Sequence, residues 1–289
     1  MENTEDKAIN IDIDAVLRQR APGIRRLMPR ILVRSLEKLI CQDGLNYLLH
    51  HNHGRRDADF CAGILSDLNV EVDVAGHIPE ASRKRVLLVC NHPLGALDGI
   101  AIIHVLTGIY GCKIRFIVND LLMAVEPLRG VFVPINKHGR QSRGATNAID
   151  EAMAGNEPVV IFPAGLCSRQ GPAGEICDLE WKKMFVTKAI RYNRDVIPMH
   201  FDGRNSRFFY KFAKWRKRLG LKFNLEMILL PREIFRNRNK RFTLTFGQPI
   251  PFGSLTESPA KMAAMIKQTV YNLPAAIASQ TKQNTIHHA

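Results

Sequence analysis

The chain has 289 residues, of which 46% are hydrophobic and only 7% aromatic. This length suits one large α/β domain with a small attachment, and this composition excludes an extensively disordered chain. Lysine and arginine number 41 against 27 aspartates and glutamates, so the net charge is +14. Such a charge favours an anionic partner, and it does not choose among nucleic acid, an acidic lipid surface and an acidic carrier protein.

The cysteines and the first residues indicate a cellular compartment. The six cysteines form no CxxC pair, which is typical of reduced thiols in a cytosolic protein. The polar, acidic start of the sequence does not resemble a secretory signal, and no apolar run reaches the ~18 residues that a membrane-spanning helix needs. We therefore expect a cytoplasmic protein whose contact with a membrane is peripheral.

The first part of the chain has helical periodicity. Apolar residues recur at helical spacing from Ile24 to Ile40, and Pro29 is expected to kink or divide this helix. A second helix is expected from Arg56 to Leu68. These signals predict an N-terminal helical region over residues 1–80, followed by a second domain over residues 81–289.

From residue 81 onward, short apolar runs alternate with stretches that favour helices. The expected strands are Val86–Cys90, Ile114–Val118, Val131–Ile135, Val159–Phe162, Val196–Phe201, Leu225–Leu230 and Phe242–Phe246. The expected helices between them include Asp98–Leu106, Gly144–Met153 and Lys182–Tyr192. This alternation predicts an α/β fold with a mainly parallel, mixed central sheet covered by helices on both faces.

One stretch carries the strongest chemical signal. Residues 86–99 read VLLVCNHPLGALDG, so His92 follows a buried strand and Asp98 stands at the start of a helix. Sites in open α/β sheets gather beyond the carboxyl ends of the strands. A histidine can take the proton of an alcohol near neutral pH, and a carboxylate on its far nitrogen fixes the tautomer. For an arbitrary pair at this spacing, a turn cap and a helix cap are the simpler explanation.

Asn91-His92-Pro93 and Asp98-Gly99 resemble the first motif, NHxxxxD, of the glycerolipid and lysophospholipid acyltransferase family. The match is best with a bacterial branch labelled hemolysins, in which the motif reads NHPLGGLDG. This chain has five residues between histidine and aspartate instead of four, and a bulge at Gly95 is expected to keep the pair in contact. The resemblance implies that His92 is the general base and that Asp98 orients it.

Three further blocks resemble those of the family and follow in its order. They are residues 131–140 (VFVPINKHGR), residues 162–169 (FPAGLCSR) and residues 195–201 (DVIPMHF). With residues 246–250, the similarity covers roughly residues 84–252. Four blocks in order are far more specific than any one of them.

The third block departs from the family pattern FPEGTRSR, because Ala164, Leu166 and Cys167 replace its Glu, Thr and first Arg. In the family, that Glu and Arg help to hold a glycerol-phosphate headgroup, so the departure favours another acceptor, such as an amino-acid-containing lyso-lipid. The substrate-binding candidates that the resemblance implies are Asn91, Gly95, Lys137, Arg140, Gly165, Ser168 and Arg169.

By resemblance, the acyl donor is a thioester of acyl carrier protein or coenzyme A, the acceptor is a lyso-lipid, and no cofactor or metal is required. Both donors are anionic, which agrees with the positive charge of the chain. The resemblance also implies a location on the inner face of the cytoplasmic membrane.

Residues 204–218 form a basic segment with an aromatic stripe. Phe208, Phe212, Trp215 and Leu219 recur on one helical face, with basic residues such as Lys211 and Arg218 on the others. Such a helix can lie in the headgroup layer of an anionic membrane. It can equally pack its stripe on the sheet and expose the cations to water. The sequence leaves both interpretations open.

Other function classes fit parts of the sequence. The same His–Asp pair can serve a lipid or thioester hydrolase, but the GxSxG motif of serine hydrolases is absent. A basic nucleic-acid-binding protein fits the charge, but the sequence has no zinc-finger or RNA-recognition signature. A membrane-lytic protein is a fourth class, and without a spanning segment its lysis would follow from lipid chemistry. We expect an acyltransferase that binds no nucleic acid.

Overall fold

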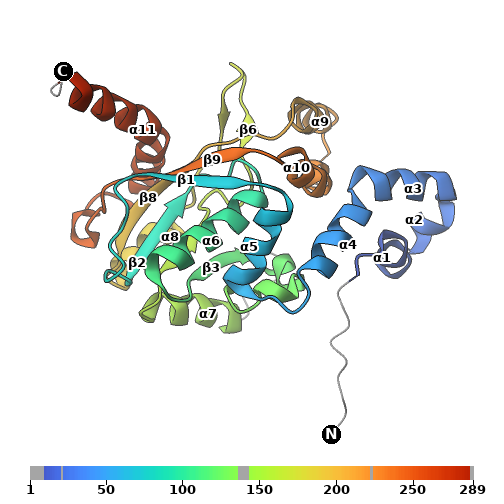
Figure 1. The fold of residues 1–289 in the computed structure, drawn as a ribbon, viewed down its shortest axis with the longest axis horizontal. Coiled ribbons are helices and arrows are strands. Elements are labelled where there is room, and N and C mark those ends of the chain that lie inside the picture. The colour runs from blue at the N-terminus through green and yellow to red at the C-terminus, as the bar shows by residue number, and fades with distance from the viewer. Residues whose placement is uncertain (1–9, 21, 136–142, 222–223, 287–289) are drawn as a thin grey trace, which may run out of the picture.

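The computed structural model describes residues 10–20, 22–135, 143–221 and 224–286, in which seven strands form one sheet of order β1-β9-β8-β2-β5-β3-β4 (Figure 1). Every neighbouring pair in this sheet is parallel except β8 and β9, which are antiparallel. The predicted α/β class with a mainly parallel, mixed sheet is therefore confirmed. The strands are β1 (Glu71–Gly76), β2 (Val86–Cys90), β3 (Arg115–Asn119), β4 (Phe132–Ile135), β5 (Val159–Ile161), β8 (Asp195–Phe201) and β9 (Arg241–Phe246).

Helices cover both faces of the sheet, as predicted. On one face the core includes residues of α5 (Asp57–Asp67) and α6 (Leu97–Tyr110), and on the other it includes residues of α7 (Arg143–Ala154), α8 (Met184–Arg191) and α11 (Pro259–Ile286). The residues of β2 are all buried and alternate between these two cores. Burial on both faces explains why the central strands read as continuous apolar runs.

The N-terminal region begins with α1 (Ile13–Arg20), α2 (Pro22–Leu27), α3 (Arg30–Leu39) and α4 (Gln42–His51). Pro29 stands between α2 and α3, so the predicted division of the helix is present. An all-helical region through residue 80 is wrong, because β1 pairs in parallel with β9 in the main sheet. The edge position of β1 leaves its side chains partly exposed, so the strand lacks the fully apolar run of its buried neighbours.

One other predicted element is wrong. The apolar run Leu225–Leu230 was expected as a strand, but it forms the 3-10 helix η3 (Leu225–Leu229) and the start of α10 (Leu230–Arg236). Pro231 lies in the first turn of α10, where it costs no helical hydrogen bond. The remaining elements are α9 (Arg207–Arg218), the antiparallel hairpin of β6 (Arg169–Gln170) and β7 (Ile176–Cys177), and the 3-10 helices η1 (Asp120–Ala124), η2 (Glu126–Leu128) and η4 (Phe252–Ser254).

Candidate active site

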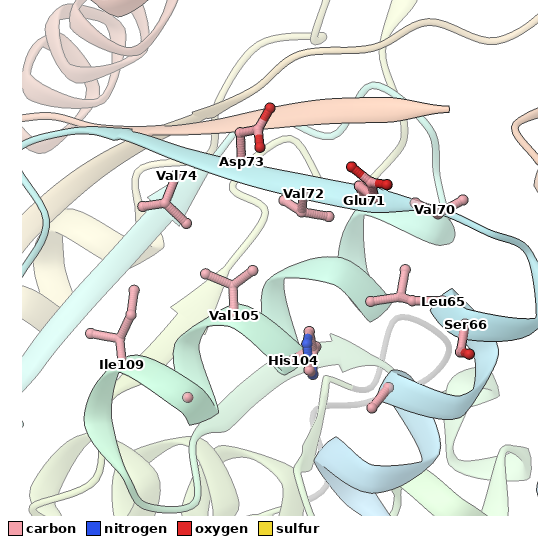
Figure 2. Close-up of a pocket in the computed structure, with 12 residues that line it drawn as sticks. Leu65, Ser66, Val70, Glu71, Val72, Asp73, Val74, His104, Val105 and Ile109 are labelled. Carbon is pink, nitrogen blue, oxygen red and sulfur yellow. The ribbon is translucent and has the colours of Figure 1, made fainter. Parts of the chain in front are cut away.

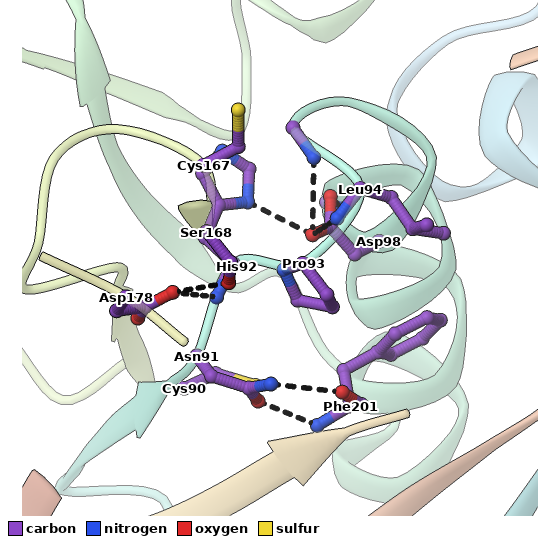
Figure 3. Close-up of polar contacts among 12 residues, drawn as sticks. Cys90, Asn91, His92, Pro93, Leu94, Asp98, Cys167, Ser168, Asp178 and Phe201 are labelled. Carbon is purple, nitrogen blue, oxygen red and sulfur yellow. Dashed lines mark hydrogen bonds and ion pairs between the residues drawn. The ribbon is translucent and has the colours of Figure 1, made fainter. Parts of the chain in front are cut away.

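His92 lies on the loop that follows the central strand β2, and its ring contacts a buried carboxylate (Figure 3). The distance from His92 Nδ1 to Asp98 Oδ2 is 2.9 Å. Asp98 lies in the first turn of α6, and its side chain is fully buried. Because the carboxylate accepts a hydrogen bond from Nδ1, Nε2 is left as the nitrogen that can accept a proton.

The loop between the two residues closes on the same carboxylate. The backbone N–H groups of Leu94 and Gly95 donate to Asp98 Oδ2 over 2.9 and 3.3 Å. Gly95 has φ = +81°, a left-handed conformation that glycine adopts without strain. The five-residue spacer therefore closes as the sequence predicted, and the His92–Asp98 contact is preserved.

A side chain at position 95 would also meet its neighbours. A Cβ there would lie 2.8 Å from Leu230 Cδ2 and 3.0 Å from Cys167 Cβ. The glycine thus permits both the turn and the close approach of α10 and the loop after β5.

The His92 ring is held from the side by Phe162, which directly follows β5. The ring centroids of His92 and Phe162 are 3.8 Å apart, and the planes are inclined by 18°. The side chain of His92 is 14% exposed. The stack and the bond to Asp98 together restrict the ring to one orientation with a narrow opening to solvent.

The main chain of His92 is held at both its N–H and its C=O. Ser168 N–H donates to His92 O over 2.7 Å, and His92 N–H donates to Asp178 Oδ1 over 3.2 Å. The hydroxyl of Ser168 donates to the same oxygen over 2.6 Å (Figure 3). Sequence reasoning missed Asp178, because it follows the short hairpin of β6 and β7 and belongs to no block of the family pattern.

Several predicted substrate-binding side chains are bonded within the protein. The Asn91 amide donates to Phe201 O and accepts from Phe201 N–H, which joins β2 to β8 beyond their paired residues. The side chain of Ser168 is buried. Substrate contact by these two residues stays a prediction, and their observed contacts build the walls of the site.

Arg169 is also bonded within the protein. Its guanidinium pairs with the fully buried Glu226 over 2.8 Å and donates to Cys167 O over 2.7 Å. Glu226 also pairs with Arg216 of α9 over 2.7 Å. The third block is thereby joined to α9 through one buried carboxylate. Lys137 and Arg140 lie outside the described residues.

A cavity of about 770 Å³ opens beside the third block. Its wall includes Ala164 and Gly165 of that block, and Gly165 has φ = +66°. Glu180, Lys182, Lys183 and Asn224 also line it. The cavity therefore offers two cations beside the third block, and His92, Asp98 and Phe162 are not among the residues that line it.

A second cavity, of about 720 Å³, lies between β1, α5 and α6 (Figure 2). Its wall is mostly apolar, with His104 of α6 as a polar exception, and the carboxylates of Glu71 and Asp73 on β1 point to the other side of the strand (Figure 2). Both carboxylates pair with Arg241. None of the residues that hold His92 lines this cavity.

Burial decides the state of the cysteine in the third block. It raises the pKa of the Cys167 thiol to about 11, although the nearby Arg169 guanidinium lowers it. At neutral pH the group is a thiol rather than a thiolate, so Cys167 is not an activated nucleophile.

The aromatic stripe of α9 lies on the surface. Phe208 is 47% and Trp215 is 54% exposed, whereas the opposite face of the helix buries Phe209, Tyr210 and Ala213. Leu219 is 55% exposed, and Phe212 stacks between Phe208 and Trp215. Lys211 and Arg218 are exposed. Phe212 packs partly against the buried cluster that includes Phe209 and Tyr210, and the rest of the stripe is exposed, so the structure favours the interpretation in which the stripe is available to a membrane. No helix in the described part of the chain is both long and apolar enough to span a bilayer.

Comparisons with known proteins identify the family of the chain. A family model described as acyltransferase matches residues 15–277. The chain is 42% identical over 274 residues to a lyso-glycine lipid O-acyltransferase of Phocaeicola vulgatus, covering 93% of this chain and 97% of that protein. It is 41% identical over 272 residues to the protein of the same name from Bacteroides thetaiotaomicron, covering 93% and 100%.

Among solved structures, the 1-acyl-sn-glycerophosphate acyltransferase PlsC of Thermotoga maritima is similar with a TM-score of 0.45 and 17% identity, covering 86% of this chain and 98% of that one. The family model spans most of the chain, and the two relatives align with it over nearly their whole length. The chain is therefore an enzyme that belongs to the acyltransferase family, as the ordered blocks predicted.

Proposed function

We propose that this protein is a lipid O-acyltransferase that moves a fatty acyl group from acyl carrier protein or coenzyme A to the hydroxyl of an amino-acid-containing lyso-lipid. The names of both relatives, which describe acyl transfer to a lyso-glycine lipid, support this class of acceptor. The loss of the family's Glu and Arg at Ala164 and Cys167 also favours an acceptor other than a glycerol phosphate.

In the proposed reaction, His92 Nε2 takes the proton of the acceptor hydroxyl as its oxygen attacks the thioester carbonyl. A C–O bond forms, and the tetrahedral intermediate then collapses with cleavage of the C–S bond. The departing thiolate takes the proton from the imidazolium, which returns the histidine to its starting state. Asp98 stabilises the imidazolium between the two steps.

The observation that most strongly supports this mechanism is the 2.9 Å distance between His92 Nδ1 and Oδ2 of the fully buried Asp98. A carboxylate with no exposed surface keeps its interaction with the ring unscreened by water. By contrast, the side chain of His51, which pairs with Asp67, is 57% exposed.

The acceptor headgroup is proposed to lie in the cavity beside Gly165, with Lys182 and Lys183 near its carboxylate. Lysine ammonium groups bind carboxylates through charge-assisted hydrogen bonds. Lys137 and Arg140 stay candidates for the same role from the sequence pattern alone. No metal or prosthetic group enters the proposed reaction.

The exposed stripe of α9 is proposed to bind an anionic membrane surface, from which a lyso-lipid can enter the site. Phe208 and Trp215 would enter the headgroup layer, and Lys211 and Arg218 would contact the phosphates. The side chains of Leu27 and Ile31, in the helices before α4, are 85% and 72% exposed and offer a second apolar contact. This arrangement agrees with a peripheral location on the inner face of the cytoplasmic membrane.

The reaction is tested with the purified full chain, labelled acyl carrier protein or acyl coenzyme A, and a panel of lyso-lipids that includes lyso-glycine lipid and a lyso-glycerophosphate. We expect mass spectrometry to detect the acylated lyso-glycine lipid. His92→Ala should remove this product, and Asp98→Asn should lower kcat about a thousandfold. Free fatty acid as the sole product would instead identify a hydrolase, and acylation of the lyso-glycerophosphate alone would refute the amino-acid headgroup.

Membrane contact is tested by sedimentation with vesicles of mixed anionic and zwitterionic lipids. The double variant Phe208→Ser/Trp215→Ser should bind at least about tenfold more weakly, because each of these half-exposed side chains would lose part of the roughly 1.5–3 kcal/mol that full burial of a large apolar side chain contributes. Phe252→Ser is the matched control, because Phe252 is 39% exposed on η4. Equal losses in the variant and the control would contradict a role specific to α9.

A further inference from the structure

A second buried carboxylate, Asp178, stands behind the candidate site. Its side chain is 3% exposed, and it follows β7 on the loop that leads to α8. Oδ1 accepts hydrogen bonds from His92 N–H over 3.2 Å and from Ser168 Oγ over 2.6 Å. Oδ2 accepts from Trp181 Nε1–H over 2.9 Å. These donors come from separate segments of the chain and meet on one side chain.

The arrangement of these donors requires a carboxylate. Both the backbone N–H of His92 and the indole N–H of Trp181 can only donate, and they meet opposite oxygens of Asp178. An asparagine has one oxygen and one NH₂ group, so in either orientation its NH₂ would face one of these N–H groups. A buried donor that faces another donor is left without an acceptor, which is costly.

The backbone of Asp178 is anchored to the C-terminal helix α11. Asp178 N–H donates to the hydroxyl of Tyr271 over 2.7 Å. Lys267 Nζ donates to the main-chain oxygen of Asp178 over 2.7 Å. The carboxylate is therefore attached to a rigid element rather than to the loop alone.

Asp178 restrains the main chain of His92, whereas Asp98 restrains its ring. Asp98 and Phe162 fix the imidazole ring. Asp178 holds the peptide N–H of His92, and Ser168, itself bonded to Asp178, holds the peptide C=O. Because the main chain on both sides of the His92 Cα and the imidazole ring are all restrained, Nε2 has a defined position before substrate arrives, which is what a proton transfer at fixed geometry needs.

We propose that Asp178 is a positioning residue for acyl transfer, which fixes the main chain of His92 so that its Nε2 faces the acceptor hydroxyl. This inference rests on the proposed function, in which His92 is the base. Asp178 does not contact substrate, so its loss changes the turnover step and leaves donor binding intact.

The test measures kcat and KM of Asp178→Asn for the acyl thioester, with acylation of lyso-glycine lipid as the readout and circular dichroism to measure the folded fraction. We expect kcat per folded protein to fall about 10- to 100-fold, since small displacements of a reacting group have effects of this size. KM for the thioester should stay within about twofold of wild type. A purely structural role would lower the folded fraction and leave kcat per folded protein unchanged.

A rescue variant tests the donor argument directly. In Asp178→Asn/Trp181→Phe the indole N–H is absent. The asparagine NH₂ can then point toward residue 181, and the asparagine oxygen can accept hydrogen bonds from His92 N–H and the Ser168 hydroxyl. We expect this double variant to recover at least about fivefold in kcat over Asp178→Asn. No recovery would contradict the proposed hydrogen-bond geometry.

Two further variants separate this inference from the proposed function. Asp73→Asn is the matched control, because Asp73 lies half-exposed on the edge strand β1, and it should retain wild-type kcat.

If Asp178→Asn does not fold, Tyr271→Phe removes the hydroxyl that accepts from Asp178 N–H and should lower kcat several-fold at unchanged KM. An unchanged kcat in the folded variants, with His92→Ala inactive, would overturn the role of Asp178 alone. An inactive wild-type enzyme would refute the proposed function and this inference together.

Discussion

The imidazole of His92 lies almost flat against the ring of Phe162, with centroids 3.8 Å apart and planes inclined by 18°. Phe162 follows β5 and His92 follows β2, so the contact forms because these two strands are parallel neighbours that end at the same edge. The stack restrains the ring in the direction that its hydrogen bond to Asp98 leaves open.

Replacing Phe162 should therefore remove one of the contacts that hold the imidazole ring of His92 in place. We expect Phe162→Leu to lower kcat about 2- to 10-fold, in line with the contribution of a stacked ring pair. Phe116→Leu is the matched control, because Phe116 packs on Phe162 at 5.2 Å and belongs to the buried core. Steady-state kinetics should show a larger loss for Phe162→Leu, and equal losses would indicate that core packing alone is responsible.

Two glycines with the same backbone preference allow strain to be separated from crowding. Gly95 and Gly174 both have positive φ, at +81° and +95°. A Cβ at Gly95 would lie within 3.0 Å of Cys167, whereas one at Gly174 would have nothing within 4 Å. Gly174→Ala should cost about 1 kcal/mol from backbone strain alone. Gly95→Ala should cost at least about 1 kcal/mol more in urea unfolding and should also lower kcat. Equal unfolding costs would show that Leu230 and Cys167 move aside.

Arg194 is predicted to be essential for stability. It is fully buried, and its guanidinium donates to five backbone carbonyls, those of Val86, Ala152, Met153, Gly155 and Glu157. Burial lowers the pKa of Arg194 to about 10, so it stays charged at neutral pH. Arg194→Met should lower the free energy of unfolding by at least about 3 kcal/mol, because these carbonyls lose a charged donor inside the protein. Arg191→Met, on the exposed side of α8, should cost less than about 1 kcal/mol in the same denaturant titration.

The stability of the protein should fall in mild acid because of His200. Burial lowers the pKa of His200 to about 4, below its usual 6.5. As the pH falls from about 6.5 to about 4, the unfolded chain takes up a proton that the folded chain does not, so the folded state loses up to about 3 kcal/mol. Above pH 6.5 this contribution is fully present. His200→Phe should remove this part of the pH dependence, as measured by urea unfolding at several pH values. His104→Phe, at an exposed position, should leave the pH dependence unchanged.

How much of the fold the sequence predicts depends on local burial. The strand β2 is buried on both sides and reads as an unbroken apolar run, and β8 is apolar and buried except at Asp195 and His200, so the positions of both strands were predicted correctly. The edge strand β1 has an alternating, half-exposed pattern and was missed. The run Leu225–Leu230 is nearly as apolar as a strand, but it contains Glu226, whose buried carboxylate pairs with Arg169 and Arg216. The hydrophobic pattern of the run does not reveal these ion pairs.

The site divides in the same way. The sequence by itself determined His92, Asp98 and the turn at Gly95, because all three lie within a few residues of each other and local geometry brings them together. Only the tertiary structure decided that Asp178 holds the main chain of His92, since the two are separated by 86 positions and meet through the packing of the hairpin on the loop. The tertiary structure also decided that Glu226 forms an ion pair with Arg169, and that the stripe of α9 faces outward. Each of these contacts joins segments far apart in the chain, and the residue types at one end do not specify the partner at the other.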